Sequence, residues 1–327
     1  MRLFAYALRE YDELGYLQKM ASEKGFAFGW TPEYPTAKNV ELARGYDAIN
    51  IITSPMGADL LAKFHEVGIR NVATRTIGYD HIDVAAAKGL GMRVAHAVYP
   101  PEGVANYSIM LMMMAMRKVK LIMRGNDSQS FGLRGKIGMD ISSATVGIVG
   151  TGRIGATVAR HLSGFGCKLL AYDPYPNQDV ARVATYVDLD TLLSQSDAIT
   201  LHAPGMEENY HMIDADAFAK MPQGAVLVNA ARGSLVDTTA LIQSLESGHL
   251  GAAALDTIEN EANLYYHDKS RDVLPNHDRA ILGSFPNVIV SPHMAFYTEE
   301  DVEDMIRTSC EALLSFDAGE DSPYEVR

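Results

Sequence analysis

Three side chains suited to acid–base and anion chemistry stand in the second half of the chain: Arg232, Glu261 and His293. Each comes soon after a short apolar run that predicts a buried strand. In parallel α/β sheets, ligands bind at the carboxyl ends of the strands, so these side chains can converge on one site. An arginine offers a planar fork to a carboxylate, and a histidine beside a glutamate can be held in its charged form. The pattern predicts a site that holds a carboxylate and moves a proton.

Each of these residues also has a structural interpretation when it is taken alone. A glycine-flanked arginine can simply tie down carbonyl groups. Glu261 lies in an acidic loop with Glu259, which is typical of a solvated surface, and one histidine among ten is weak by itself. Their joint placement after successive strands favours the catalytic interpretation.

A glycine-rich turn supplies the second chemical signal. A buried strand runs into Gly-x-Gly-x-x-Gly, with Gly150, Gly152 and Gly155 at the three positions. The first allows a sharp turn, the second lets a pyrophosphate approach the backbone, and the third lets the helix pack on the strand. The next predicted strand ends at Asp173, whose carboxylate can bind ribose hydroxyls and would repel a 2′-phosphate. The pattern predicts a dinucleotide site that prefers NAD to NADP; a tight strand–helix turn without a ligand is the structural alternative.

The elements that must position these residues alternate between strands and helices. From Ser143 to about Pro292, the chain has the six strands that a dinucleotide-binding fold needs. These predicted strands are Thr145–Val149, Lys168–Tyr172, Ala198–Leu201, Ala225–Asn229, Gly251–Leu255 and Val288–Val290. Residues 1–100 repeat the alternation without a glycine-rich turn, with strands Leu3–Leu8, Ala48–Ile52, Asn71–Ala73 and Arg93–Ala95.

A rigid connection, Tyr99-Pro100-Pro101, is predicted between the two α/β segments. Beyond it, Gly103–Arg124 is expected to form one long helix that is apolar almost all the way round. Its methionines are Met110, Met112, Met113, Met114 and Met116. We expect this helix to be buried on every side, between two domains and against the second subunit of a homodimer.

Composition excludes several classes of protein. The length of 327 residues is enough for two domains, and 47% hydrophobic with 21% charged residues is ordinary globular composition. A net charge of −13 opposes binding to nucleic acid or to an anionic membrane surface. Two cysteines cannot make a disulfide framework or a zinc site, which favours a cytoplasmic location.

Together the motifs resemble the D-isomer-specific 2-hydroxyacid dehydrogenases, and among them the D-lactate, D-hydroxyisocaproate and phenyllactate dehydrogenases. The matching stretches are Thr74–Asp83, Val149–Gly155, Leu201–Pro204, Asn229–Gly233, Leu235–Asp237, Ala254–Glu261 and Ser291–Thr298. The resemblance implies two Rossmann-like, doubly wound parallel-sheet α/β domains with the active site in the cleft between them. It implies a discontinuous substrate domain, 1–100 plus 297–327, and a dinucleotide-binding domain, 101–296.

The resemblance also implies the role of each residue. The catalytic residues would be Arg232, Glu261 and His293. Residues implied to contact the NAD cofactor are Gly150, Gly152, Arg153, Ile154, Gly155, Asp173, Ala203, Pro204, Asn209, Ala230, Ala231, Arg232 and Asp256. Residues implied to bind the substrate are Ile52, Ile77, Gly78, Tyr99, Arg232 and Phe296, with the backbone amides of Ile77 and Gly78 on its carboxylate. No metal is required, because arginine and imidazolium already stabilise the oxyanion.

The expected function is the reduction of a 2-keto acid by NADH, with His293 as the proton donor. Ile52 stands where, by resemblance, lactate-preferring members carry a tyrosine, so a larger apolar substrate such as phenylpyruvate is expected to compete with pyruvate. Proline replaces the usual serine at position 100, with no consequence that the sequence reveals. A phosphoglycerate dehydrogenase is the alternative of the same fold, although no regulatory extension follows the last predicted helix, Thr298–Phe316. An NAD(H)-sensing regulatory protein is the alternative of a different class, although the chain lacks extra segments for recruiting partners.

Overall fold

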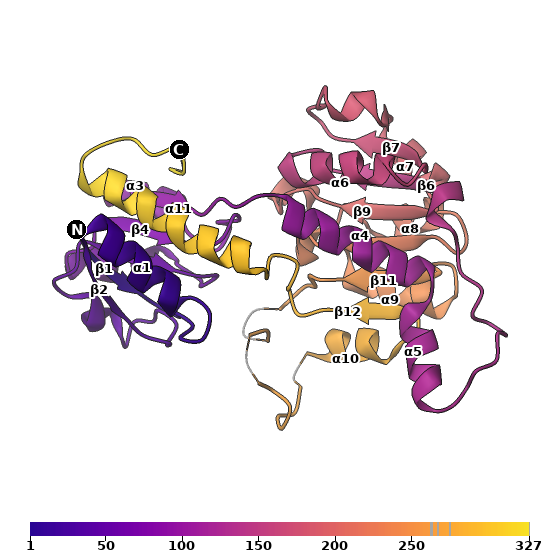
Figure 1. The fold of residues 1–327 in the computed structure, drawn as a ribbon, viewed down its shortest axis with the longest axis horizontal. Coiled ribbons are helices and arrows are strands. Elements are labelled where there is room, and N and C mark those ends of the chain that lie inside the picture. Colours follow the sequence, from indigo (N-terminus) through magenta and orange to yellow (C-terminus); the bar gives the residue numbers. More distant parts are fainter. Residues whose placement is uncertain (262–263, 267, 275, 327) are drawn as a thin grey trace. The chain divides into compact units, whose positions relative to one another are not determined.

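The computed structural model describes residues 1–261, 264–266, 268–274 and 276–326. The chain forms two compact units (Figure 1): unit 1 comprises Met1–Pro100 and Tyr297–Arg327, and unit 2 comprises Pro101–Phe296. Each unit is a parallel sheet with helices on both of its faces. This architecture confirms the predicted class, two doubly wound α/β domains.

Unit 1 is built on a five-stranded parallel sheet with the order β2-β1-β3-β4-β5. Its strands are β1 (Arg2–Ala5), β2 (Ala27–Trp30), β3 (Ala48–Ile51), β4 (Asn71–Thr74) and β5 (Arg93–His96). Its helices are α1 (Leu14–Lys24), α2 (Ala58–Glu66), α3 (Val84–Gly89) and α11 (Glu299–Asp317), with a 3₁₀ turn η1 (Val40–Ala43).

Both faces of this sheet are buried, because side chains alternate along each strand. On one face, Phe4 and Ile49 belong to a core that includes Phe64 of α2. On the other, Leu3 and its neighbours pack against α1 and Leu313 of α11. The last helix of the chain, yellow in Figure 1, thus lies beside α1 and completes unit 1.

The edge strand β2 was absent from the sequence-based prediction. Its residue Gly29 packs beneath the side chain of Tyr46, and a Cβ at this position would overlap the Tyr46 hydroxyl. A short edge strand with a glycine has little of the β-branched pattern that predicts strands.

Unit 2 is built on a seven-stranded parallel sheet with the order β12-β11-β10-β9-β6-β7-β8. Its strands are β6 (Thr145–Val149), β7 (Lys168–Tyr172), β8 (Thr185–Tyr186), β9 (Ala198–Leu201), β10 (Val226–Asn229), β11 (Ala252–Leu255) and β12 (Val288–Val290). Its helices are α4 (Glu102–Met116), α5 (Val119–Asp127), α6 (Arg153–Ser163), α7 (Leu189–Gln195), α8 (Ala215–Lys220), α9 (Thr238–Glu246) and α10 (His277–Ser284). Its 3₁₀ turns are η2 (Ile141–Ser143), η3 (Val180–Arg182), η4 (Glu207–Asn209) and η5 (Gly233–Leu235).

The helices of unit 2 cover the two faces of this sheet in two groups. Helices α4 and α6 bury one face, and α7, α8, α9 and α10 bury the other. The strand order reverses between β6 and β9, the two strands from which the chain proceeds in opposite directions across the sheet. In sheets of this kind a ligand binds outside the carboxyl ends of the strands at that reversal.

The prediction of one long helix over Gly103–Arg124 is wrong. The segment forms two helices, and the break falls at Lys118, whose backbone is left-handed with φ 53°. Met110 and Met113 of α4 are exposed in the single chain, so burial of this helix on every side would require the second subunit that we expect. Met112 and Met116 on the opposite side of the helix are buried against the sheet.

Within the described part of the chain, no helix has both the length and the apolar character needed to cross a membrane. The same residues contain no group of His, Cys, Asp and Glu side chains that could hold a metal ion.

Candidate active site

The glycine-rich turn lies at the strand reversal of unit 2. Gly150 follows β6 with φ 89°, and a Cβ there would lie 2.6 Å from the backbone nitrogen of Ala203, which follows β9. At Gly155 a Cβ would overlap the carbonyl oxygen of Gly150. By contrast, a Cβ at Gly152 would meet no atom within 4 Å. The first and third glycines are therefore required by packing, whereas the second borders open space.

The helix that starts at this turn lacks the side-chain cap that four other helices of unit 2 have. Helices α7, α8, α9 and α10 each have an Asp or Asn side chain that caps a first-turn amide. Helix α6 begins at Gly152 with no side-chain cap. Its first-turn amides and its dipole can therefore receive an anionic ligand such as a pyrophosphate.

Asp173 closes the other side of this turn, at the end of β7. Its Oδ2 accepts a hydrogen bond from the Thr151 backbone nitrogen at 2.6 Å, and its Oδ1 accepts one from Tyr175 at 2.8 Å. The carboxylate is thus fixed beside the glycine-rich turn, where an acidic residue can accept ribose hydroxyls.

The loop after β9 carries Ala203, Pro204 and Asn209 on the same edge of the sheet. The Asn209 side chain folds this loop, since it donates to the Pro204 carbonyl at 2.7 Å and accepts from the Met206 nitrogen at 2.9 Å. Arg153 of α6 is exposed and Ile154 is half-buried against the core of the sheet.

Arg232 lies in a tight loop directly after β10. The Asn229 side chain braces this loop, accepting from the Ala231 nitrogen at 3.0 Å and donating to the Arg232 carbonyl at 2.8 Å. The half-buried Arg232 guanidinium donates to the Ala231 carbonyl at 2.8 Å. At Gly233 a Cβ would overlap the backbone of Ile258, so this loop is packed directly on the loop after β11.

The interpretation of the loop after β11 as a solvated surface is wrong for Glu259, whose carboxylate is bonded to other loops. Its Oε1 lies 2.7 Å from His211 Nε2, and its Oε2 accepts from the Thr238 hydroxyl at 2.7 Å and the Thr238 backbone nitrogen at 3.1 Å. Partial burial alone would raise the pKa of Glu259, but the hydrogen bonds from His211 and Thr238 outweigh it and lower the pKa below 4.5. One carboxylate therefore joins the loops that follow β9, β10 and β11.

His293 and Glu261 form a direct pair. Nδ1 of His293 lies 2.7 Å from Oε1 of Glu261, while Oε2 of Glu261 accepts from the Ile258 backbone nitrogen at 3.1 Å. Both side chains remain about one-quarter exposed, at 28% and 27%. Because the carboxylate engages Nδ1, the imidazole can exchange a proton with a ligand through Nε2.

The backbone of His293 is left-handed, with φ 54°, and Asp256 holds it there. The Asp256 carboxylate is fully buried and accepts from Ser291 Oγ at 2.6 Å and from the backbone nitrogens of Met294 and Ala295 at 2.8 and 2.9 Å. Its carbonyl accepts from the His293 nitrogen at 2.9 Å. Asp256 therefore acts on the loop that presents His293.

Tyr266 is a neighbour of this pair that the sequence analysis missed. Its hydroxyl donates to the His293 carbonyl at 2.9 Å, and its ring meets Phe296 edge-on with centroids 6.3 Å apart. The His293 ring also meets Phe296 edge-on, at 6.5 Å. Two successive tyrosines soon after Glu261 were the available signal, but nothing local in the sequence connects them with residue 293.

The remaining predicted residues belong to unit 1. Ile52 follows β3 and is 3% exposed, and Tyr99 is 8% exposed. Ile77 and Gly78 are half-buried in the loop after β4.

The sequence analysis gave no role to Arg75, which precedes this loop and is fully buried. It forms an ion pair with the equally buried Glu13 at 2.9 Å and donates to the carbonyls of Tyr6 and Ala7 at 3.1 and 3.0 Å. It also donates to Asn50 at the end of β3, at 3.2 Å. A buried arginine with this many acceptors joins the carboxyl ends of the central strands of unit 1.

Comparison with known proteins agrees with this arrangement. Residues 109–295 match the model of the NAD binding domain of D-isomer specific 2-hydroxyacid dehydrogenases. The chain is 36% identical over 320 residues to an aromatic 2-oxoacid reductase of Clostridium sporogenes, covering 97% of this chain and 96% of that protein. It is 35% identical over 329 residues to a D-lactate dehydrogenase of Escherichia coli, covering 100% of both. The solved structure of a D-2-hydroxyisocaproate dehydrogenase superimposes with a TM-score of 0.89 at 34% identity, covering 100% of this chain and 99% of that one.

Proposed function

The chain belongs to the D-isomer specific 2-hydroxyacid dehydrogenases and is an NAD-dependent enzyme of that family, and on this premise we propose that it works mainly as a reductase of 2-keto acids with apolar side chains. The observation that carries the proposal is the His293–Glu261 pair at 2.7 Å. The pair lies at the carboxyl ends of the strands of unit 2, where the loop that contains Arg232 also lies. A proton donor beside an anion-binding arginine is what the reduction of a 2-keto acid needs.

The residues at the glycine-rich turn fit the cofactor. The open space at Gly152 and the uncapped start of α6 suit a pyrophosphate, and the Asp173 carboxylate suits an unmodified adenosine ribose. We assign the surrounding contacts to Gly150, Arg153, Ile154, Gly155, Ala203, Pro204, Asn209, Ala230, Ala231 and Arg232. Asp256, predicted from the resemblance as a further contact, is fully buried and supports the His293 loop instead. Reduced NAD supplies the hydride that is added to the keto carbon.

The chain's own side chains then handle the charges of the reaction. Arg232 and the backbone amides of Ile77 and Gly78 bind the substrate carboxylate. His293, oriented by Glu261, donates a proton to the oxygen that becomes the hydroxyl group. Arginine and imidazolium together stabilise the negative charge that develops on that oxygen.

The substrate class rests on three residues that we assign to the substrate pocket, Ile52, Tyr99 and Phe296, all apolar or aromatic. Such a lining favours a branched or aromatic side chain, since each buried methylene contributes about 0.8 kcal/mol. A second carboxylate would be left without a partner, so dicarboxylic keto acids should be poor substrates. Relatives named for aromatic 2-oxoacids and for D-2-hydroxyisocaproate support this choice, and one named for D-lactate keeps pyruvate as the competitor.

We further propose that the enzyme is a cytoplasmic homodimer. The segment after α5 exposes Phe131, Leu133 and Ile137, which are 73%, 88% and 84% exposed, and α4 exposes Met110 and Met113. This much apolar surface in one stretch of chain is typical of a subunit interface. The two free cysteines, one of them buried, support a reducing compartment.

The test is a panel of keto acids assayed with NADH and NADPH. We expect kcat/KM for phenylpyruvate or 2-ketoisocaproate to match or exceed that for pyruvate, and 2-oxoglutarate to be poor. NADH should be preferred at least about tenfold, because a carboxylate at Asp173 repels a 2′-phosphate. In Ile52→Tyr, the preference should move toward pyruvate. A clear pyruvate preference that Ile52→Tyr leaves unchanged would contradict the proposed substrate class.

A further inference from the structure

The loop Thr76–Tyr79 follows β4 and carries the two amides that we assign to the substrate carboxylate. We propose that Thr76 is a positioning residue for carboxylate binding. Its hydroxyl is the last member of a directed hydrogen-bond chain that starts at His81 and holds the Gly78 carbonyl. The inference rests on the proposed function, since it explains how that loop is kept in its binding conformation.

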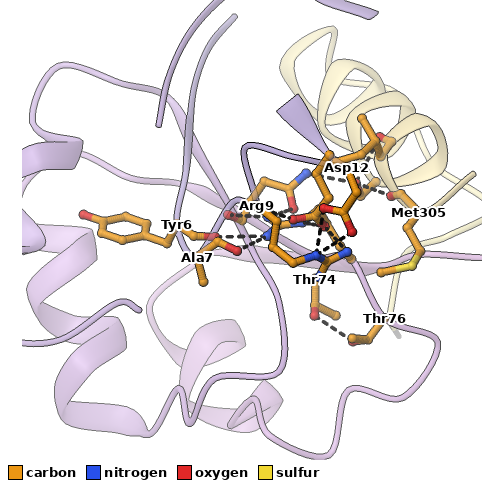
Figure 2. A network of polar contacts seen from close by, with 12 residues as sticks. Tyr6, Ala7, Arg9, Asp12, Thr74, Thr76 and Met305 are labelled. Carbon is orange, nitrogen blue, oxygen red and sulfur yellow. Dashed lines mark hydrogen bonds and ion pairs between the residues drawn. The ribbon is translucent and has the colours of Figure 1, made fainter. Parts of the chain in front are cut away.

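The direction of this chain follows from counting protons. The Thr76 hydroxyl lies 2.6 Å from the Gly78 carbonyl, which can only accept, so Thr76 donates its one proton there. The two hydroxyls of Thr74 and Thr76 are 2.7 Å apart, so Thr74 must be the donor between them (Figure 2). His81 Nε2 lies 3.0 Å from the Thr74 hydroxyl and must donate in its turn. His81 therefore carries a proton on Nε2.

The chain matters because it fixes peptide planes on both sides of the Gly78 amide. The Thr76 carbonyl accepts from the Ala97 nitrogen at 3.0 Å, which orients the plane that contains the Ile77 N–H. The Thr76 hydroxyl fixes the Gly78 carbonyl, and with it the plane that contains the Tyr79 N–H. Peptide groups are planar and their N–H and C=O point in opposite directions, so the Gly78 N–H lies on a segment fixed at both ends.

The residues on both sides of the Thr76–Tyr79 loop are anchored. The His81 carbonyl accepts from the Met56 nitrogen at 2.8 Å, and the Met56 carbonyl accepts from the Asp83 nitrogen at 2.9 Å. On the other side, Arg75 is held by its buried ion pair with Glu13. The loop between these anchors has one side-chain bond of its own at Gly78, the one from Thr76.

The test compares Thr76→Val, which keeps the volume and removes the hydroxyl, with Thr76→Ser, which keeps the hydroxyl. Thr36→Val is the matched control, because Thr36 lies in an exposed loop of the same unit and its hydroxyl bonds only within that loop. We expect Thr76→Val to raise KM for the keto acid about 3- to 10-fold, which is the effect expected from the loss of one hydrogen bond. The dissociation constant of oxamate, a non-reducible carboxylate analogue, should rise by a similar factor in the presence of NADH. The affinity for NADH and the pH profile of kcat should stay as in the wild type, and Thr76→Ser should restore KM.

Amide hydrogen exchange of residues 76–79 gives a readout that does not depend on turnover. We expect faster exchange there in Thr76→Val and not in Thr76→Ser or Thr36→Val. Unchanged exchange together with unchanged KM would overturn the positioning role while the reductase function stands. Faster exchange with unchanged oxamate binding would also overturn it, because the loop would then not bind the carboxylate. A wild-type enzyme that reduces no 2-keto acid would remove the proposed function, and this inference with it.

Discussion

At the scale of single residues, the proton donor that we propose is one imidazole held by two carboxylates. Glu261 bonds the ring of His293, and Asp256 holds its backbone in a left-handed conformation. A non-glycine residue with that backbone costs about 1–3 kcal/mol and persists only where its surroundings impose it. The Asp256 carboxylate accepts three hydrogen bonds from this turn, and these bonds hold the backbone of His293 in its left-handed conformation. His293 therefore lies on a rigid turn.

The first prediction concerns the proton donor. His293→Gln should lower kcat about 100- to 10,000-fold, the usual contribution of general acid catalysis. NADH affinity, measured by fluorescence titration, should stay within a few-fold. A variant that keeps more than about a tenth of the wild-type kcat would remove His293 from this role.

The second prediction concerns its partner. Glu261→Gln should lower kcat more than NADH affinity, because a neutral amide holds the His293 ring by a weaker hydrogen bond than the carboxylate does at 2.7 Å. The measurements are steady-state kinetics of keto acid reduction and fluorescence titration with NADH. A kcat equal to that of the wild type would remove Glu261 from the positioning of the ring.

At the scale of elements, the site depends on loops that follow adjacent parallel strands. The loops after β9, β10 and β11 leave the same edge of the sheet because the strands run parallel in the order β11-β10-β9. They are locked together in two ways: Gly233 packs on the backbone of Ile258, and Glu259 bonds both His211 and Thr238. Arg232 and Glu261 therefore sit on loops that can hardly move independently.

The third prediction tests this lock. Glu259→Gln should lower the free energy of unfolding by about 1.5–3 kcal/mol, the range for hydrogen bonds to a charged group. It should lower kcat more than NADH affinity, since the catalytic loops are displaced. Denaturant unfolding and steady-state kinetics measure both effects. Glu246→Gln, on an exposed carboxylate of the same unit, is the control and should behave as the wild type.

The same carboxylate predicts a dependence of stability on pH. Because the pKa of Glu259 is lowered in the folded state, its contribution is present above pH 4.5 and is lost as the pH falls through the folded value. The stability difference between wild type and Glu259→Gln should therefore shrink in acid. A difference that grows on acidification would contradict this assignment.

At the scale of the whole molecule, the exposed apolar segment after α5 is the feature that an isolated chain does not explain. Phe131, Leu133 and Ile137 lie among the most exposed large apolar side chains of the described residues. Leaving such a patch in water is unfavourable, and a second copy of the chain would cover it.

The fourth prediction follows from that surface. The triple variant Phe131→Asp, Leu133→Asp, Ile137→Asp should sediment as a monomer at a concentration where the wild type sediments as a dimer. Val273→Asp is the control, since it places a charge on an equally exposed aliphatic residue of another segment. A wild type that is monomeric at micromolar concentration, or a triple variant that stays dimeric, would refute the homodimer.

The sequence by itself determined the fold class and the cofactor, and it placed the three candidate catalytic residues in loops that follow strands of unit 2. These features are encoded locally. Strands buried on both faces must be apolar throughout, as in Val146–Val149, and a turn packed on a neighbouring backbone must be glycine, as at Gly150 and Gly155. Such constraints act within a few residues, so a single chain displays them.

Only the tertiary structure decided how distant segments meet. From the sequence alone, Glu259 is expected at the surface. In the structure, the strand order places His211, which is 48 positions away, within hydrogen-bond distance of its carboxylate. Tyr266 donates a hydrogen bond to the carbonyl of His293, which is 27 positions away. The helix break at Lys118 interrupts an apolar pattern that would suit a continuous helix. The hydrogen-bond chain from His81 to Thr76 could likewise be identified only from the distances between its atoms in the structure. Hydrogen bonds form between whatever atoms the packed sheet brings within about 3 Å, and local sequence patterns do not encode that proximity.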